Sequence, residues 1–339
     1  MHQLGRSESF LHGGGFIPMS SFLGIDVSKG DFHAALIMGD RTWSKSFANN
    51  KTGMAQLAIW LKNRKVIDEL HACLESTGGF EEALALDLHE RGITVSVVNP
   101  SRIKAFAQSE LLRTKNDAVD AALIARFCKA HLPEVWVPLA PEIRALQALV
   151  RRHANIQDML VSEKNRLGAA NIDSAVERSL REHITFLESD LERVVAEIDE
   201  LINRHPPLRE QRDLLKSIPG IAGLTASRIL GEMPNIAEYR DARAVAAFAG
   251  LSPREHQSGT SRGRTQLAKT GNSRLRKMLY FPAISATRFN PVIKALYDRL
   301  IAAGKPKMLA LAAAMRKLLI LAYGVLKSQQ PFNPAHANA

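Results

Sequence analysis

The sequence predicts a mixed α/β domain followed by a helical segment and a mostly α-helical domain. Three observations lead to this order. Strand-like and helix-like stretches alternate over the first third of the chain, apolar residues then recur at helical spacing, and helical stretches later flank a basic, glycine-containing loop. We expect these three regions at 21–140, 141–212 and 213–330, with a disordered extension over 1–20 and a tail over 331–339.

The first domain is predicted to contain five strands and three helices. The stretches FLGIDV, FHAALIM and TWSKSFA are rich in apolar, aromatic and β-branched residues and predict three consecutive strands. A helix over 52–64, the strand HACLE, a helix over 81–91, the strand TVSVV and a helix beginning near Asp117 follow. The order β-β-β-α-β-α-β-α indicates a mixed sheet with helices on its faces.

The second region carries a heptad pattern. Apolar residues alternate spacings of four and three at Leu180, Ile184, Leu187, Leu191, Val194, Ile198 and Leu201. Such a seam fits an intramolecular helical hairpin or a coiled coil that joins two subunits. The pattern spans about three heptads, near the minimum for a coiled coil, and we slightly favour the subunit contact.

The third region contains two features typical of nucleic-acid binding. In LLKSIPGIAGLTASRILGEM, two helical stretches flank a Pro-Gly-Ile-Ala-Gly turn, as in a helix-hairpin-helix, although an ordinary helix turn also fits. Between residues 254 and 277 there are seven basic residues and one acid, separated by Gly and Ser. This density predicts nucleic-acid contacts rather than a solvated loop. The basic residues are Arg254, Arg262, Arg264, Lys269, Arg274, Arg276 and Lys277.

Composition narrows the partners further. Forty-five Lys and Arg against 34 Asp and Glu give a net charge of +11 and a pI near 9.8, which favours a polyanion, nucleic acid before membrane. Cys73 and Cys128 lie in apolar surroundings without metal-ligand spacing, so we expect buried free thiols in a reducing cytoplasm. No signal-peptide run precedes residue 20, and the apolar stretch MLALAAAMRKLLILAYGVL predicts a buried helix rather than a membrane span.

Four acidic residues are candidates for a metal site. Asp117 and Asp120 lie three residues apart in a predicted first helical turn, where they share a face. Acidic residues in a first turn often only cap the helix and interact favourably with the positive end of its dipole. Asp26, however, lies within an apolar strand, where burial is costly without a partner, and Glu75 ends the fourth strand. If those strands are neighbours, four carboxylates can meet and bind two Mg²⁺ about 4 Å apart.

An Asp on strand one, a Glu on strand four and an Asp-x-x-Asp helix resemble the RuvC-like branch of the RNase H fold. The surrounding segments GIDVSKGDFHAAL, LESTGGFEEALALDLHERGITVSVVNP, KAFAQSELLRTKNDAVDA, AAFAGLSPR, SGTSRGR and KTGNSRLRKMLYFPA narrow the resemblance. Together they resemble the DEDD transposases of bridge-RNA-guided insertion sequences, which are related to the pilin-gene invertase. The resemblance extends over about 22–330, nearly the whole chain.

This resemblance implies roles for particular residues. The family's catalytic, metal-binding acids fall on Asp26, Glu75, Asp117 and Asp120, and its nucleophilic serine on Ser258 in HQSGTS, with Thr260 and Ser261 close by. Arg262 and Arg264 are candidates to stabilise developing negative charge. A serine nucleophile implies recombination through a protein–DNA ester rather than hydrolysis.

The resemblance also implies partners. They are a non-coding bridge RNA, donor and target double-stranded DNA, and further copies of the chain, as a dimer that assembles into a tetramer. Base pairing would read sequence while the protein reads backbone and shape. The expected location is the bacterial cytoplasm, at the nucleoid when the protein acts.

Three other functions fit parts of the sequence. A Holliday-junction resolvase-type nuclease would use the four acids with water and leave Ser258 an ordinary residue. A phosphotransferase of the actin and sugar-kinase superfamily could use GIDVSKG, but further glycine-rich phosphate loops are not evident. An architectural DNA-binding protein would explain the charge but not Asp26.

Overall fold

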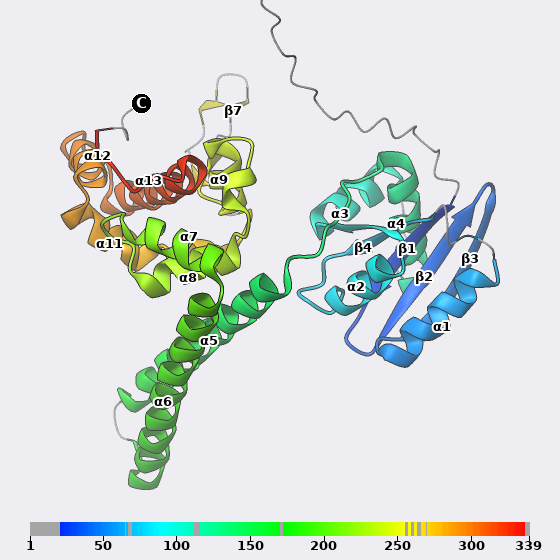
Figure 1. Ribbon diagram of the computed structural model, residues 1–339, viewed down its shortest axis with the longest axis horizontal. Helices are drawn as coiled ribbons and strands as arrows, with labels where there is room; N and C mark the ends of the chain where they lie inside the picture. The colour runs from blue at the N-terminus through cyan, green and yellow to red at the C-terminus, as the bar shows by residue number, and fades with distance from the viewer. Residues whose placement is uncertain are drawn as a thin grey trace, which may run out of the picture. The chain divides into compact units, whose positions relative to one another are not determined.

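The computed structural model describes residues 21–64, 66, 70–111, 116–169, 172–254, 257–258, 261–262, 266–268 and 270–335. The chain divides into two compact units, Met1–Pro138 and Leu139–Ala339 (Figure 1). Each unit has its own buried hydrophobic residues.

The first unit is built on a five-stranded mixed sheet with the strand order β3-β2-β1-β4-β5. β1 pairs antiparallel with β2 and parallel with β4, so the predicted neighbours, strands one and four, do lie side by side. β2 and β3 are antiparallel, and β4 and β5 are parallel. The strands are β1 (Ser21–Val27), β2 (Asp31–Met38), β3 (Arg41–Ala48), β4 (Leu70–Glu75) and β5 (Thr94–Val98).

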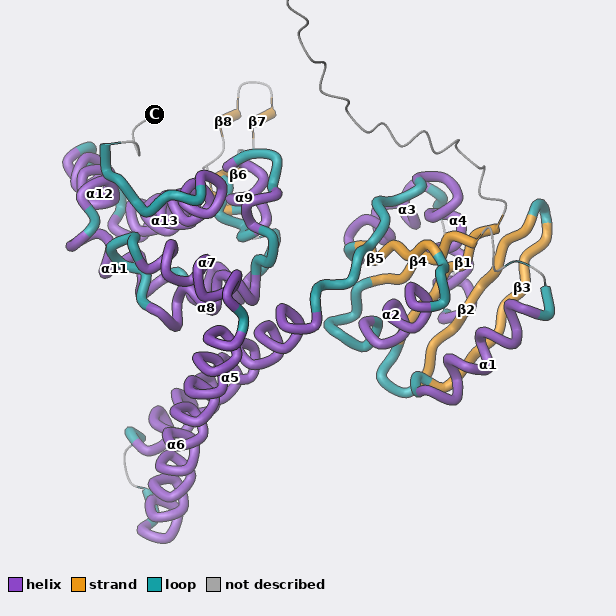
Figure 2. The backbone as a smooth tube through the Cα atoms, in the orientation of Figure 1, coloured by secondary structure: helices purple, strands orange, loops and turns teal. Residues whose placement is uncertain are grey.

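Two pairs of helices cover the two faces of this sheet (Figure 2). α1 (Lys51–Lys62) and α2 (Glu82–Glu90) pack on the face that carries Leu23 and Ile25. α3 (Pro100–Ser109) and α4 (Asp117–His131) pack on the face that carries Phe22 and Cys73. The mixed α/β architecture is confirmed, with one correction, because two helices rather than one follow β5.

Gly24 allows α4 to lie directly on β1. A Cβ atom at Gly24 would come within 2.1 Å of the backbone nitrogen of Ala125 and 2.2 Å of the carbonyl oxygen of Ala121. Any side chain at this position would therefore displace the helix. Farther along α4, the Cys128 thiol lies 3.6 Å from the carbonyl oxygen of His71 in β4. Cys73 and Cys128 are buried free thiols, as predicted.

The second unit begins with a helical hairpin of α5 (Pro141–Leu167) and α6 (Ser174–Arg204). The predicted heptad seam packs on α5 of the same chain, as in the intramolecular hairpin that we weighed against a contact between subunits. A heptad pattern defines an apolar face but does not say which helix covers it. Asp190, buried in the hairpin, accepts hydrogen bonds from Arg152 at 3.0 Å and from Arg193, and these lower its pKa, with Arg193 the main cause.

The remaining helices form a bundle around α13 (Lys307–Ser328). By length and composition α13 could cross a membrane, but 61% of its most apolar window is buried inside the protein, as predicted for a core helix. The other elements are α7 (Pro206–Lys216), α8 (Gly223–Glu232), the 3₁₀ helix η2 (Ile236–Glu238), α9 (Ala242–Phe248), α10 (Ser273–Met278), α11 (Tyr280–Phe289) and α12 (Pro291–Ala302).

Candidate active site

Asp26 and Glu75 end neighbouring parallel strands on the same face of the sheet. Ile25 of β1 pairs with Leu74 of β4, so the two acids are the next residues along the strands and point to one side. Asp26 shares its side with Gly24, which lies under α4. Asp26 is half-buried near the carboxyl end of β1, rather than buried in its middle as the sequence suggested, because the strand ends at Val27.

The first turn of α4 places Asp117 and Asp120 over this face. Asp117 shares a helix face with Ala121 and Ala125, which lie against Gly24. Asp120 is aligned in the same way with Cys128, which contacts β4. The α4 cap is made by Asn116, whose side chain accepts a hydrogen bond of 2.9 Å from the backbone N–H of Val119. Capping by the two aspartates is therefore not needed.

His33 is a polar residue of this face that sequence reasoning missed. In the ladder between β1 and β2 it is the direct partner of Asp26. Its Nδ1 also lies 3.7 Å from Oδ2 of Asp117, which is largely exposed. His33 thus links an acid of the sheet to an acid of α4. Only the strand register could reveal this pairing, because His33 has no motif of its own.

Glu81 is a second residue that sequence reasoning missed. It is buried, and its carboxylate accepts hydrogen bonds from Ser76 Oγ at 3.0 Å, from the N–H and Oγ1 of Thr77, each at 3.1 Å, and from the N–H of Gly79 at 2.9 Å. Burial alone would raise the pKa of Glu81, but these hydrogen bonds together lower it. Glu81 therefore fixes the loop that directly follows Glu75.

Asn49 connects the loops beyond β1 and β4. Its Nδ2 donates to the carbonyl oxygen of Ser28 at 2.9 Å and to that of Phe80 at 3.2 Å. Ser28 follows β1 directly, and Phe80 lies in the loop fixed by Glu81. One side chain thus holds together the chain segments that leave the two acid-bearing strands.

Replacing Glu81 with Gln should destabilise the loop after β4, by about 1–3 kcal/mol, because the new amide would place a donor among donors. The pKa of Glu81 lies below its usual value of 4.5 in the folded chain, so its stabilisation is complete above the unfolded pKa and is lost as the pH falls through the folded pKa. Near neutral pH, amide hydrogen exchange at Thr77 and Gly79 should be faster in Glu81→Gln than in the parent. This difference between the two proteins should shrink below about pH 4.5. The exposed Glu90→Gln, at the last residue of α2, is the control, and equal exchange in both variants would contradict this role of Glu81.

The four acids offer the hard oxygen donors that Mg²⁺ and similar cations prefer. Within the described parts of the chain, however, no three His, Cys, Asp or Glu side chains lie close enough together to hold a metal ion. The fold therefore brings the predicted acids to one end of one sheet face without gathering them at ligand distances. The donor types fit a divalent cation.

Ser258 lies in the second unit, in a small strand pair rather than in the loop expected from its Gly, Ser and basic residues. β7 (Gln257–Ser258) pairs antiparallel with β8 (Ser261–Arg262), which makes Ser258 and Ser261 direct partners. β6 (Pro253–Arg254) pairs with β9 (Gln266–Leu267). These strands are two residues long and lack the alternation of apolar residues by which strands are predicted.

The other predicted nucleic-acid contacts are divided between these strands and α10. Arg254 and Arg262 lie in β6 and β8, whereas Arg264 and Lys269 fall outside the described residues. On α10, Arg274 is exposed, Arg276 donates to the carbonyl oxygen of Ala249 at 3.0 Å, and Lys277 pairs with Asp158 at 2.5 Å.

The predicted Pro-Gly-Ile-Ala-Gly turn joins α7 to α8. Gly220 has a φ of +106°, and a Cβ atom there would lie 2.7 Å from that of Ala286 in α11. Asn290 donates to the carbonyl oxygen of Pro219 at 3.3 Å. The turn is thus packed against α11, and this close packing explains why a glycine stands at position 220. Phosphate binding by this turn stays a prediction.

Comparison with known proteins agrees with this combination of an acid-bearing α/β unit and a helical unit. Residues 23–170 match the transposase model DEDD_Tnp_IS110, and residues 212–298 match the model described as "Transposase IS116/IS110/IS902 family". The chain is 32% identical to the pilin gene-inverting protein of Moraxella bovis, over 92% of this chain and 98% of that protein. The chain belongs to the IS110 family of transposases.

More distant relatives of this transposase include the transposase for insertion sequence element IS1111A of Coxiella burnetii. The two are 24% identical, over 78% of each chain. The transposase for IS1328 of Yersinia enterocolitica is 23% identical, over 78% of this chain and 83% of that protein. The protein is thus an enzyme of DNA transposition and recombination, and its DEDD family indicates dependence on a divalent metal.

Proposed function

We propose that this transposase cuts and rejoins DNA with a RuvC-like, RNase H-type acid set and a serine nucleophile, guided by a bridge RNA. The observation that carries the proposal is the placement of acids from three separate segments on one sheet face. Asp26 and Glu75 end adjacent parallel strands, and α4 covers that face with Asp117 and Asp120 in its first turn. Acids brought together from distant parts of a basic chain favour phosphodiester chemistry over a structural role.

The four carboxylates would hold Mg²⁺, two ions in each site, which would polarise the phosphate and stabilise the leaving oxygen. Asp26 and Glu75 would supply donors from the sheet, and Asp117 and Asp120 from α4. His33 is the strand partner of Asp26, and its Nδ1 lies 3.7 Å from Asp117 Oδ2, so it would help to orient the Asp117 carboxylate. Glu81 and Asn49 would keep the strand ends in place while the charge at the site changes.

The proposed nucleophile is Ser258. Its Oγ would lose its proton, attack the phosphorus and form a phosphoserine ester, while the bond to one deoxyribose oxygen breaks and that oxygen takes up a proton in turn. A hydroxyl of the partner DNA would then attack the ester, which releases Ser258 and reseals the strand. The number of phosphodiester bonds is conserved, so no ATP is required. Arg262 and Arg264 would stabilise the negative charge on the phosphorane.

The proposed partners are a non-coding bridge RNA together with donor and target double-stranded DNA. The chain's net charge of +11 supports a large nucleic-acid partner. Recombination requires cutting and exchange of four strands, so we propose dimers that assemble into a tetramer on the DNA, at the nucleoid. Since α5 already covers the α6 seam, contacts between subunits would use other surfaces.

The guide RNA is tested by purification. The protein isolated at low salt should carry a discrete RNA encoded beside its own gene, and its affinity should fall steeply with salt because phosphate contacts release counterions. Sequencing of the bound RNA and a recombination assay with and without it check this expectation. Recombination at full rate by RNA-free protein would refute guidance and leave the nuclease chemistry open.

A further inference from the structure

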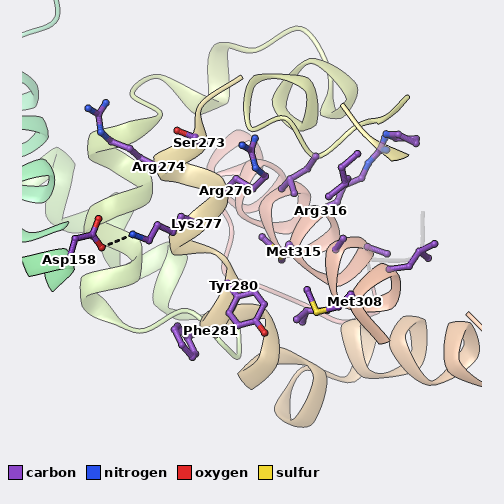
Figure 3. Close-up of a pocket in the computed structure, with 17 residues that line it drawn as sticks. Asp158, Ser273, Arg274, Arg276, Lys277, Tyr280, Phe281, Met308, Met315 and Arg316 are labelled. Carbon is purple, nitrogen blue, oxygen red and sulfur yellow. Dashed lines mark hydrogen bonds and ion pairs between the residues drawn. The ribbon is translucent and has the colours of Figure 1, made fainter. Parts of the chain in front are cut away.

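The second unit contains a groove of about 1190 Å³ beside the amino-terminal half of α13 (Figure 3). We call it the α13 groove. Its floor is apolar and includes Leu251, Leu311 and Met315, with Tyr280 at the start of α11. It is not part of the acid-bearing site, which belongs to the first unit.

Cations surround this apolar floor. Arg274, Arg276, Lys277 and Arg316 line the groove, against one acid, Asp158. Arg276 is held by the carbonyl oxygen of Ala249, and Lys277 pairs with Asp158, as Figure 3 shows for the second pair. In the described residues, neither Arg274 nor Arg316 has a carboxylate within ion-pair distance. A half-buried guanidinium such as that of Arg316 is stabilised by an anion.

Phe281 lines the groove, and 75% of its surface is exposed. It also lines a second cavity of about 370 Å³, to which Arg274, Lys277 and Arg228 contribute. An aromatic ring so exposed is costly in water but is well suited to stacking on a flat ligand. Phe281 thus offers a stacking surface in a cavity that Arg274 and Lys277 also line.

We propose that the α13 groove binds unpaired nucleotides of a single strand, with a base against Phe281 and the apolar floor and backbone phosphates at Arg274 and Arg316. A nucleotide combines a flat, weakly polar ring with a phosphodiester anion, and this matches an apolar floor within a cationic rim. Paired bases are stacked inside a duplex and could not enter. The inference rests on the nucleic-acid binding in the proposed function and extends it to single-stranded segments, of the guide RNA or of DNA opened by it.

Fluorescence anisotropy with short single-stranded DNA and RNA oligonucleotides, on full-length protein freed of copurified nucleic acid, tests the proposal. Phe281→Ala and Arg316→Gln should each weaken binding about tenfold, as expected for loss of one stacked base or one phosphate contact. The matched controls are Phe289→Ala and Arg288→Gln, exposed residues of the same α11 that do not line the groove. Both controls should bind as the parent does.

Further probes identify the ligand. The parent should bind an oligonucleotide with abasic sites less tightly than an ordinary one. Phe281→Ala should bind the two oligonucleotides equally well, because it has already lost the stacking contact. Tighter binding of RNA assigns the groove to the guide, and tighter binding of DNA assigns it to the opened substrate.

Unchanged single-strand binding by both groove variants, or equal binding of abasic and ordinary oligonucleotides to the parent, would overturn the proposal. An acidic amphipathic peptide that displaces the oligonucleotide from the parent but not from Arg316→Gln would show that a protein segment occupies the groove instead. The assay uses neither metal nor recombination, so the proposed chemistry could fail while this result stands, and the reverse also holds.

Discussion

Asp26→Asn should abolish metal-dependent DNA cleavage, with a loss of roughly a thousandfold or more. Asparagine keeps the shape of the side chain, so β1 and its contact with α4 should be preserved. It removes the negative charge that a divalent cation requires, and the metal's contribution to phosphoryl chemistry is several kcal/mol. Glu75→Gln, Asp117→Asn and Asp120→Asn should act in the same direction.

Cleavage of end-labelled DNA over a range of Mg²⁺ and Mn²⁺ concentrations measures this loss. The matched control is Asp40→Asn, an exposed aspartate of the turn between β2 and β3, which should cut at the parent rate. Full cleavage by Asp26→Asn would show that the metal site lies elsewhere. Partial recovery at high Mn²⁺ would instead support a weakened site.

Ser258→Ala should form no covalent protein–DNA intermediate while binding DNA and RNA normally. A serine hydroxyl is a weak nucleophile and needs activation by a base or a metal, so its replacement by alanine removes the attacking atom itself and not a helper. Denaturing gels of the parent protein with labelled DNA should show a slow, protease-sensitive band that requires the metal. That band should be absent from Ser258→Ala.

Ser261→Ala is the natural control because Ser261 is the direct strand partner of Ser258. If Ser258→Ala retains the covalent band and Ser261→Ala loses it, the nucleophile is Ser261. If the parent cuts DNA but never forms the band, water is the nucleophile and the resolvase-type nuclease becomes the better assignment. Both outcomes leave the assignment of the four acids intact.

The sequence predicts much of the first unit because its elements are encoded locally. Runs rich in apolar, aromatic and β-branched residues predict the strands, and an acid within or at the end of such a run is conspicuous, so the amino-acid sequence alone makes Asp26 and Glu75 candidates. The structure confirms that their strands are neighbours. The paired acids of α4 are visible from their spacing, and the structure adds that Asn116 makes the cap.

The features that could not be predicted from the sequence depend on contacts between distant segments. His33 acquires its place only through the register of β2 on β1. Glu81 resembles an ordinary residue at a helix start, but its partners are in the loop before it. The heptad pattern of α6 predicts an apolar face but not the helix that packs on it. The α13 groove is lined by residues of α10, α11 and α13, which are separate in the sequence. The position of Arg316 within an apolar helix does not by itself predict such a groove.

The division of the chain into two units also separates its natural chromophores. All three tryptophans, Trp43, Trp60 and Trp136, belong to the acid-bearing unit, and all four tyrosines, Tyr239, Tyr280, Tyr297 and Tyr323, belong to the helical unit. Trp60 is buried in the first unit's core, and Tyr323 in that of the second. Emission excited at the red edge of tryptophan absorption therefore follows the melting of one unit alone, within the intact chain and without any label. A thermal scan read by this emission and one read by far-ultraviolet circular dichroism, which the helices of the other unit dominate, will coincide only if the two units unfold together.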